Sequence, residues 1–277
     1  MNVPIVTLTT DWGDRNHFSA MVKGRLYSAV PDVNVVDLSH SQDWDSRAIV
    51  SKIIRYGCFT FPAGTVHIID FCEDLLLKSV GSSNYRPVPL LAECRGHFFL
   101  CCNRKLLEFS IDSECDHIVA LPLPEGEISN TFLTYSLFCD VAAKLLKGAN
   151  PLDLGTAADP LVRRDFLKAQ YDGDIVLMRP DCIDKYGNVT FNLTYSDFES
   201  YRAGRAFRLE AKFRLGDIEK FPSITRISKY YDEVPQGNLL LTVSSLGYLQ
   251  LALNHGSVTQ YLGVDYSSVF KFVFLNR

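Results

Sequence analysis

Short apolar runs alternate with segments of helical spacing through the first half of the chain. Five runs of β-branched and aliphatic residues predict buried strands. They cover residues 3–9, 33–38, 66–70, 98–102 and 117–121. Three segments with apolar residues every three or four positions predict helices, at 18–30, 46–58 and 131–147. This alternation favours a mostly parallel sheet with helices packed on it.

The pattern changes after a connecting stretch that begins at Pro151. Strand-like runs then dominate, and turn sequences at 184–187 and 235–237 separate some of them. These runs cover 174–178, 188–193, 207–213, 238–243 and 268–275, and helical spacing is confined to 195–201. We therefore expect an α/β domain over 1–167, followed by a smaller antiparallel β-barrel-like domain over 168–277.

Composition and charge narrow the class of protein. The chain has 277 residues, 47% of them hydrophobic and 22% charged, which is ordinary for a folded globular protein. The net charge of -4 and the lack of a Lys/Arg run argue against binding to nucleic acid or to an anionic membrane. No signal-peptide pattern and no run of about 18 apolar residues occurs, so we expect a cytoplasmic protein.

The eight cysteines form no CxxC pair, and most lie in apolar surroundings. This distribution is typical of reduced, buried thiols. The spacing does not match a zinc site, so we expect no metal.

A carboxylate follows the first predicted strand, in Thr10-Asp11-Trp12. Ligands of open α/β sheets bind at the carboxyl ends of the strands, where a carboxylate accepts hydrogen bonds from a ribose diol. An aspartate here would equally serve as a cap of the next helix. The segment by itself leaves both interpretations open.

Several further segments, in order along the chain, extend this pattern. They lie at 8–13, 21–24, 31–32, 36–40, 61–67, 129–148, 183–192 and 244–256. The stretch 61–67 matches the motif FPxGTVH, and 183–192 is similar to iDrFGNliTNi. Together they resemble the SAM hydroxide adenosyltransferase/fluorinase family over nearly the whole chain.

The resemblance implies a fold, an assembly and a reaction. Members of that family have an N-terminal α/β domain and a C-terminal β-barrel domain, and they form homotrimers. S-adenosylmethionine (SAM) lies between the N-domain of one subunit and the C-domain of the next. Active members displace methionine from SAM with water or a halide, and the resemblance implies SAM as substrate or ligand and no further cofactor.

Eight positions match the ligand-binding residues of that family. In the first domain they are Asp11 for the ribose hydroxyls, Trp44 beside the nucleoside and Phe132 as a wall near the reacting carbon. In the second domain they are Asp184 and Ser245 for the methionine amino and carboxylate groups, Tyr186 and Asn188 for adenine, and Asn254 for a further contact.

The water-activating Asp, Arg and His of the family are not retained. Counting along the motif, Cys72 stands at the Asp position and Leu133 at the His position. Leucine neither takes nor gives a proton, so we expect displacement of methionine to be weak or lost. The remaining candidates for catalysis are Asp70, Asp74 and Arg86, as substitutes across a gap, and Thr134, where halogenases have a Ser near the halide.

Three hypotheses follow from this mixture of retained and lost positions. The chain is an active enzyme with relocated groups, a non-catalytic protein that senses or sequesters an adenosyl ligand, or a relic with a filled pocket. Titration with SAM, followed by analysis of the products, separates the three.

Overall fold

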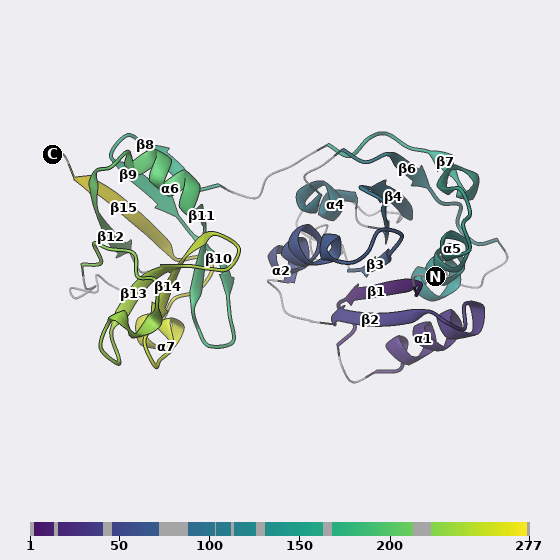
Figure 1. The fold of residues 1–277 in the computed structure, drawn as a ribbon, viewed down its shortest axis with the longest axis horizontal. Helices are drawn as coiled ribbons and strands as arrows, with labels where there is room; N and C mark the ends of the chain where they lie inside the picture. The colour runs from purple at the N-terminus through teal and green to yellow at the C-terminus, as the bar shows by residue number, and fades with distance from the viewer. Residues whose placement is uncertain are drawn as a thin grey trace. The chain divides into compact units, whose positions relative to one another are not determined.

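The chain folds into two compact units, Met1–Arg164 and Asp165–Arg277, each with its own hydrophobic core (Figure 1). This computed structural model describes residues 3–13, 16–40, 46–71, 88–102, 104–111, 114–125, 131–162, 168–212 and 223–275. The catalytic candidates Asp74 and Arg86, and the predicted binding residue Trp44, lie outside the described residues.

The first unit is built on a sheet whose described strands run in the order β2-β1-β3-β5-β4-β6-β7. Their bounds are β1 Ile5–Thr10, β2 Asn34–Ser39, β3 Val66–Asp70, β4 Leu90–Cys94, β5 His97–Cys101, β6 His117–Ala120 and β7 Thr156–Ala157. Strands β2, β1, β3 and β5 are parallel, and β4, β6 and β7 add antiparallel pairs. The expected mostly parallel sheet is confirmed.

Helices cover both faces of this sheet. They are α1 Phe18–Ala29, α2 Ser46–Lys52, η1 Ile53–Gly57, η2 Cys58–Thr60, α4 Arg104–Ser110, η3 Thr134–Phe138, α5 Cys139–Leu146 and η4 Pro151–Leu154. Val6 and Leu8 of β1 pack with α1 and α5 on one face, whereas Ile69 of β3 packs with α2 and α4 on the other. In the described ranges no helix has both the length and the apolar character to cross a bilayer.

Two of the predicted helices contain a wider π-helical turn. The segment predicted at 46–58 begins as α2, continues as the π turn η1 and ends in the 3-10 turn η2. The segment predicted at 131–147 begins with the π turn η3 before α5. Such insertions are frequent at functional sites, and η3 holds Thr134 at its first position.

The second unit contains two antiparallel sheets of four described strands each, in the orders β10-β11-β14-β13 and β12-β15-β9-β8. The strands are β8 Gln170–Asp172, β9 Ile175–Met178, β10 Pro180–Ile183, β11 Val189–Thr194, β12 Ala206–Lys212, β13 Leu239–Val243, β14 Tyr248–Leu253 and β15 Val269–Leu275. The helices are α6 Tyr195–Arg202, η5 Tyr231–Glu233 and α7 Val258–Leu262.

The two sheets share one core, and over the described residues they form no closed barrel, so the expected β-barrel-like domain is confirmed only as an antiparallel β-structure. Phe191 of β11 packs against Phe270 of β15 with 4.8 Å between ring centroids. The segment 224–227 forms one single-residue bridge to each sheet, from Ile224 to Leu209 of β12 and from Ile227 to Leu241 of β13, where a barrel would need a continuous ladder. This part of the unit is therefore an antiparallel two-sheet structure.

A disulfide corrects the expectation of reduced thiols at two positions. Cys94 at the end of β4 is bonded to Cys115, which lies just before β6. The two strands pair antiparallel, and this pairing brings cysteines 21 residues apart into contact. Cys58 and Cys139 are buried free thiols, and burial raises the pKa of each to about 12. Disulfides are rare in the cytosol, so the cytoplasmic location stays a prediction.

Two imidazoles lie inside the first unit, where His67 of β3 contacts His97 of β5. His67 Nδ1 lies 2.7 Å from Thr7 Oγ1, and its Nε2 lies 3.1 Å from His97 Nδ1. Burial lowers the pKa of His67 to about 3, and the neighbouring His97 contributes to this lowering. Burial also lowers the pKa of His97, with a second contribution from the charge of Arg95.

This pair predicts an acid-sensitive fold. As pH falls from about 6.5 toward 3, His67 becomes protonated in the unfolded chain but stays neutral in the folded chain, so the native state loses stability. We expect the free energy of unfolding of His67→Gln to fall less steeply than that of wild type as the pH is lowered from about 7.5 to about 4. Urea titrations at each pH measure it. His117→Gln, at a partly exposed position on β6, is the control, and its free energy of unfolding should depend on pH as that of wild type does. If the free energy of unfolding of His67→Gln depended on pH as that of wild type does, buried His67 would not be the cause of the acid sensitivity.

Candidate functional site

The carboxyl ends of β1, β2 and β3 meet at one edge of the first sheet because the three strands are parallel. Asp11 follows β1, His40 follows β2 and Asp70 ends β3. The backbone N–H of Asp11 donates to Asp70 O at 3.2 Å, and that of Gly13 donates to His40 O at 2.8 Å. The segment after β1 is therefore tied to both neighbouring strand ends.

Asp70 is oriented by two donors at this edge. Thr134 Oγ1 donates to Asp70 Oδ2 at 2.6 Å, and Trp12 donates a side-chain hydrogen bond to the same carboxyl group. Burial raises the pKa of Asp70, the hydrogen bond from Thr134 opposes that rise, the charge of Asp11 adds to it, and the bond from Trp12 opposes it. Two catalytic candidates, Asp70 and Thr134, are thus in direct contact.

Aromatic rings line the same edge. Phe132 lies 5.3 Å from Trp12 and 5.0 Å from Phe18, measured between ring centroids. His40 stacks on Trp12 at 6.0 Å with 14° between the ring planes, and its Nδ1 lies 2.6 Å from Thr10 Oγ1. Trp12, Phe18 and Phe132 are all partly exposed, so an apolar ring surface faces outward beside the carboxylates.

Sequence reasoning placed Asp11 and Phe132 here but gave no role to Trp12, Phe18 or His40. Asn16 fixes the loop that presents them, because its side chain donates to the carbonyl oxygens of Trp12 and Gly13 and accepts from Phe18 N. An Asn two residues before a helical Phe is a local signal of such a turn. No comparable pattern in the sequence predicts the stacking between Trp12 and His40, which are far apart in the chain.

In the second unit, Asp184 organises a turn between β10 and β11. Its Oδ1 accepts from the backbone N–H groups of Tyr186 and Asn188, both at 2.9 Å, and its Oδ2 accepts from Asn188 Nδ2 at 2.9 Å. Tyr186 is 65% exposed, with Lys185 Nζ 5.0 Å from its ring centroid. The turn therefore presents the tyrosine ring outward on a rigid support.

Asn254 lies at the same end of the sheet as this turn. Val189 of β11 pairs with Leu251 of β14, so the beginning of β11 lies beside the end of β14. Asn254 is 8% exposed, and its Nδ2 donates to Val234 O at 2.8 Å. The structure thus groups Asp184, Tyr186, Asn188 and Asn254 at one end of the sheet.

Ser245 lies at the opposite end of that sheet, in the turn between β13 and β14. The six residues of β14 separate it from Asn254, a length of about 17 Å at roughly 3.4 Å per step. Ser245 and Asp184, both predicted for the methionine end of SAM, are therefore not brought together within this unit. Their roles in binding stay predictions.

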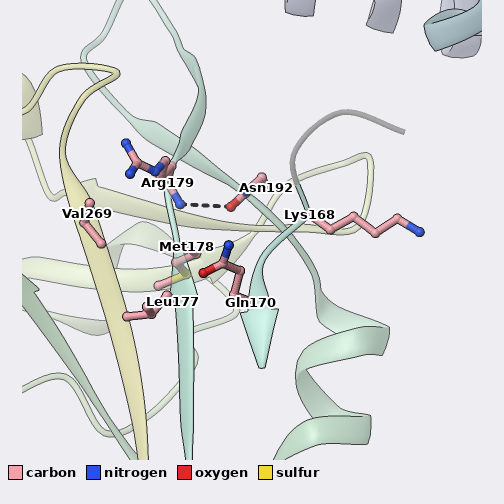
Figure 2. A pocket seen from close by; sticks show the side chains of 7 residues that line it. All are labelled: Lys168, Gln170, Leu177, Met178, Arg179, Asn192 and Val269. Carbon is pink, nitrogen blue, oxygen red and sulfur yellow. Dashed lines mark hydrogen bonds between the residues drawn. The ribbon is translucent and has the colours of Figure 1, made fainter. Parts of the chain in front are cut away.

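A small pocket elsewhere in the second unit has a volume of about 90 Å³ (Figure 2). It is lined by Lys168, Gln170, Leu177, Met178, Arg179, Asn192 and Val269. The ends of Lys168 and Arg179 point away from each other, and Asn192 Oδ1 accepts from Arg179 N at 2.9 Å. None of the predicted site residues that the structure describes lines this pocket, so it does not coincide with the predicted binding positions.

Comparison with known proteins assigns the family. Residues 6–155 match the SAM hydroxide adenosyltransferase N-terminal domain, and residues 181–271 match the SAM hydroxide adenosyltransferase C-terminal domain. The chain belongs to the SAM hydroxide adenosyltransferase family. The resemblance drawn from the ordered motifs is confirmed.

Relatives match this family member along nearly its whole length. The (R)-S-adenosyl-L-methionine hydrolase of Salinispora arenicola is 26% identical over 269 residues, 95% of each chain. That of Methanocaldococcus jannaschii is 22% identical over 279 residues, 98% of this chain and 96% of the relative.

Two solved structures share the fold. An uncharacterized conserved protein from Thermotoga maritima has a TM-score of 0.74 and 20% identity, over 97% of this chain and 99% of that chain. A conserved hypothetical protein from Thermus thermophilus has a TM-score of 0.64 and 21% identity, over 98% of this chain and 100% of that chain.

At the position where the resemblance implies a family His, this chain has Leu133, which is 6% exposed. An imidazole does lie at this sheet edge, in His40; its Nε2 is 3.3 Å from Asp37 Oδ1 but forms no hydrogen bond with the described residues. The described edge therefore combines two carboxylates, a hydroxyl, the His40 imidazole and aromatic rings, with no proton-transferring side chain at position 133. No cluster of three or more metal-ligating side chains occurs in the residues that the structure describes.

The conformation of Gly187 leads to a testable prediction about the turn that Asp184 organises between β10 and β11. It has φ +80°, and a Cβ there would clash with Ser257 Oγ, 2.0 Å away. Gly237 also has positive φ, +79°, but has no atom within 4 Å of its Cβ position. We expect Gly237→Ala to cost about 1–2 kcal/mol of stability from backbone strain, and Gly187→Ala to cost roughly 1–3 kcal/mol more from overpacking. Urea unfolding measures both, and equal losses would show that the turn does not depend on its contact with Ser257.

Proposed function

We propose that this chain binds SAM or a closely related adenosyl compound, and that its displacement of methionine is weak or lost. The observation that carries the proposal is the sheet edge where Asp11 and Asp70 lie beside the partly exposed rings of Trp12 and Phe132. Relatives named (R)-S-adenosyl-L-methionine hydrolase, matched over nearly the whole chain, support this choice of ligand.

The chemistry of the edge fits an adenosyl group. A carboxylate at a strand end accepts two hydrogen bonds from a ribose diol, the role we assign to Asp11. The neighbouring rings offer a flat apolar surface for the nucleoside. In the second unit the exposed ring of Tyr186 offers a second such surface, which we assign to adenine.

We further propose that the protein is a homotrimer and that each ligand lies between the first unit of one subunit and the second unit of the next. The division of the predicted contacts between the two units supports this arrangement. Asp11 and Phe132 belong to one unit, and Asp184, Tyr186, Asn188, Ser245 and Asn254 to the other. An exposed tyrosine held on a rigid turn is a typical interface residue.

Weak catalysis follows from the groups at the edge. In hydrolysis, water oxygen bonds to the ribose C5′, the C5′–S bond breaks with its electron pair passing to sulfur, and the water proton leaves to a base. Leu133 supplies no base, and Thr134 Oγ1 already donates to Asp70. Asp70 is the described carboxylate that remains to accept this proton.

The binding proposal predicts a loss of affinity in Asp11→Ala. Removing a charge-assisted hydrogen-bond partner costs about 1.5–3 kcal/mol, which is roughly a tenfold to a hundredfold rise in Kd. Isothermal titration with SAM and with adenosine measures it, after light scattering has determined the oligomeric state. Asp153→Ala, on the exposed turn η4, is the charge-matched control. An unchanged Kd in Asp11→Ala would mean that Asp11 only shapes its turn.

The catalytic proposal predicts little adenosine from SAM. General acid–base groups contribute about 10²–10⁴-fold, so we expect turnover lower by roughly that factor than in relatives that retain the Asp, Arg and His. Liquid chromatography after incubation with and without chloride detects adenosine and 5′-chloroadenosine. Turnover of about one per second or faster would refute the loss of activity.

A non-catalytic sensor or store of the adenosyl ligand is the second candidate function. The leucine in place of an imidazole at position 133 favours it over a fast enzyme. Tight binding of SAM without products would support it, whereas binding with steady adenosine release would support a slow hydrolase.

A further inference from the structure

Asp70 is held by side chains of two other elements. Thr134 of η3 and Trp12 of the loop after β1 both donate to its carboxyl group. The bond from Trp12 places the carboxylate beside the indole ring, and this ring contacts Phe132 edge to face, with 5.3 Å between the ring centroids. A negatively charged group next to aromatic rings is an arrangement that attracts a cation.

The position of Asp70 relative to Asp11 indicates which part of the ligand it would face. The backbone N–H of Asp11 donates to Asp70 O at 3.2 Å, so the two residues are neighbours at this edge, and the charge of Asp11 contributes to the raised pKa of Asp70. In SAM the sulfur is bonded to C5′, the carbon attached to the ribose ring. A ligand whose ribose hydroxyls contact Asp11 would therefore have its sulfur beside Asp70.

We propose that Asp70 is a specificity-determining residue that distinguishes the positively charged sulfonium of SAM from the neutral sulfur of thioether analogues. This inference rests on the proposed adenosyl binding. The carboxylate and the aromatic pair beside it stabilise a sulfonium electrostatically, whereas a neutral thioether gains only apolar contact. The site would thus favour SAM over S-adenosylhomocysteine.

The same charge slows displacement. When the C5′–S bond breaks, its electron pair neutralises the sulfur, and the attraction to Asp70 is lost as the reaction proceeds. An interaction that is stronger in the bound substrate than in the transition state lowers the rate instead of raising it. The charge of Asp70 therefore gives selectivity for a cation and, together with the missing base at position 133, contributes to weak turnover.

The experiment compares Kd values for three probes by isothermal titration in wild type and in Asp70→Asn. The probes are SAM, S-adenosylhomocysteine and sinefungin, in which a protonated amine replaces the methylated sulfonium. Asp153→Asn removes one negative charge at the exposed η4 turn and is the matched control. Circular dichroism verifies the fold of each variant, and chromatography verifies that SAM stays intact.

We expect wild type and Asp153→Asn to bind SAM and sinefungin about tenfold or more tightly than S-adenosylhomocysteine. In Asp70→Asn the three Kd values should lie within about threefold of one another, through weaker binding of the two cations.

Comparable wild-type affinity for SAM and S-adenosylhomocysteine would overturn the inference while leaving adenosyl binding intact, even if Asp70→Asn failed to fold. Retained selectivity in a folded Asp70→Asn would also overturn it. Wild type that binds none of the probes would overturn both the inference and the proposed function.

Discussion

Parallel pairing of β1 with β2 and β3 is the constraint on which the candidate site depends. It brings three carboxyl ends to one edge of the sheet, so that residues 11, 40 and 70 become neighbours. The hydrogen bonds from Asp11 N to Asp70 O and from Gly13 N to His40 O then hold the loop between them. The other contacts of the site, from the Trp12 ring to Thr134, are built on this alignment.

The second unit achieves a similar rigidity by other means. Asp184 uses its own carboxylate to accept three hydrogen bonds within five residues, and Gly187 permits the close approach of Ser257. A carboxylate engaged in this way supports the turn first, and the lone pairs that remain are available to a ligand. The exposed Tyr186 ring is the feature that this support presents.

The candidate site of the first unit has carboxylates that favour a cationic ligand but lacks a proton-transferring group at position 133. Burial and the neighbouring carboxylate of Asp11 raise the cost of ionisation at Asp70, and a cationic ligand relieves that cost. A group that transfers protons is missing at position 133, where Leu133 packs into the interior. Such an edge is better matched to holding a charged adenosyl ligand than to activating water.

Hydrophobic periodicity and ordered motifs determined much of this protein from sequence alone. They specified the parallel sheet, the strand-rich second unit and the family, because burial leaves a regular pattern in the chain. Leu133 could also be read directly, because it is a property of one residue. The strand β4 and the helix α4 were missed.

Tertiary structure decided what depends on distant neighbours. The bond between Asp70 and Thr134 joins residues 64 positions apart, and the Cys94–Cys115 disulfide depends on the pairing of β4 with β6. The arrangement of the second unit as two sheets, in place of a barrel, depends on strand pairing that alternation does not specify. A residue's type shows which chemistry is available to it, but packing decides which partner it meets.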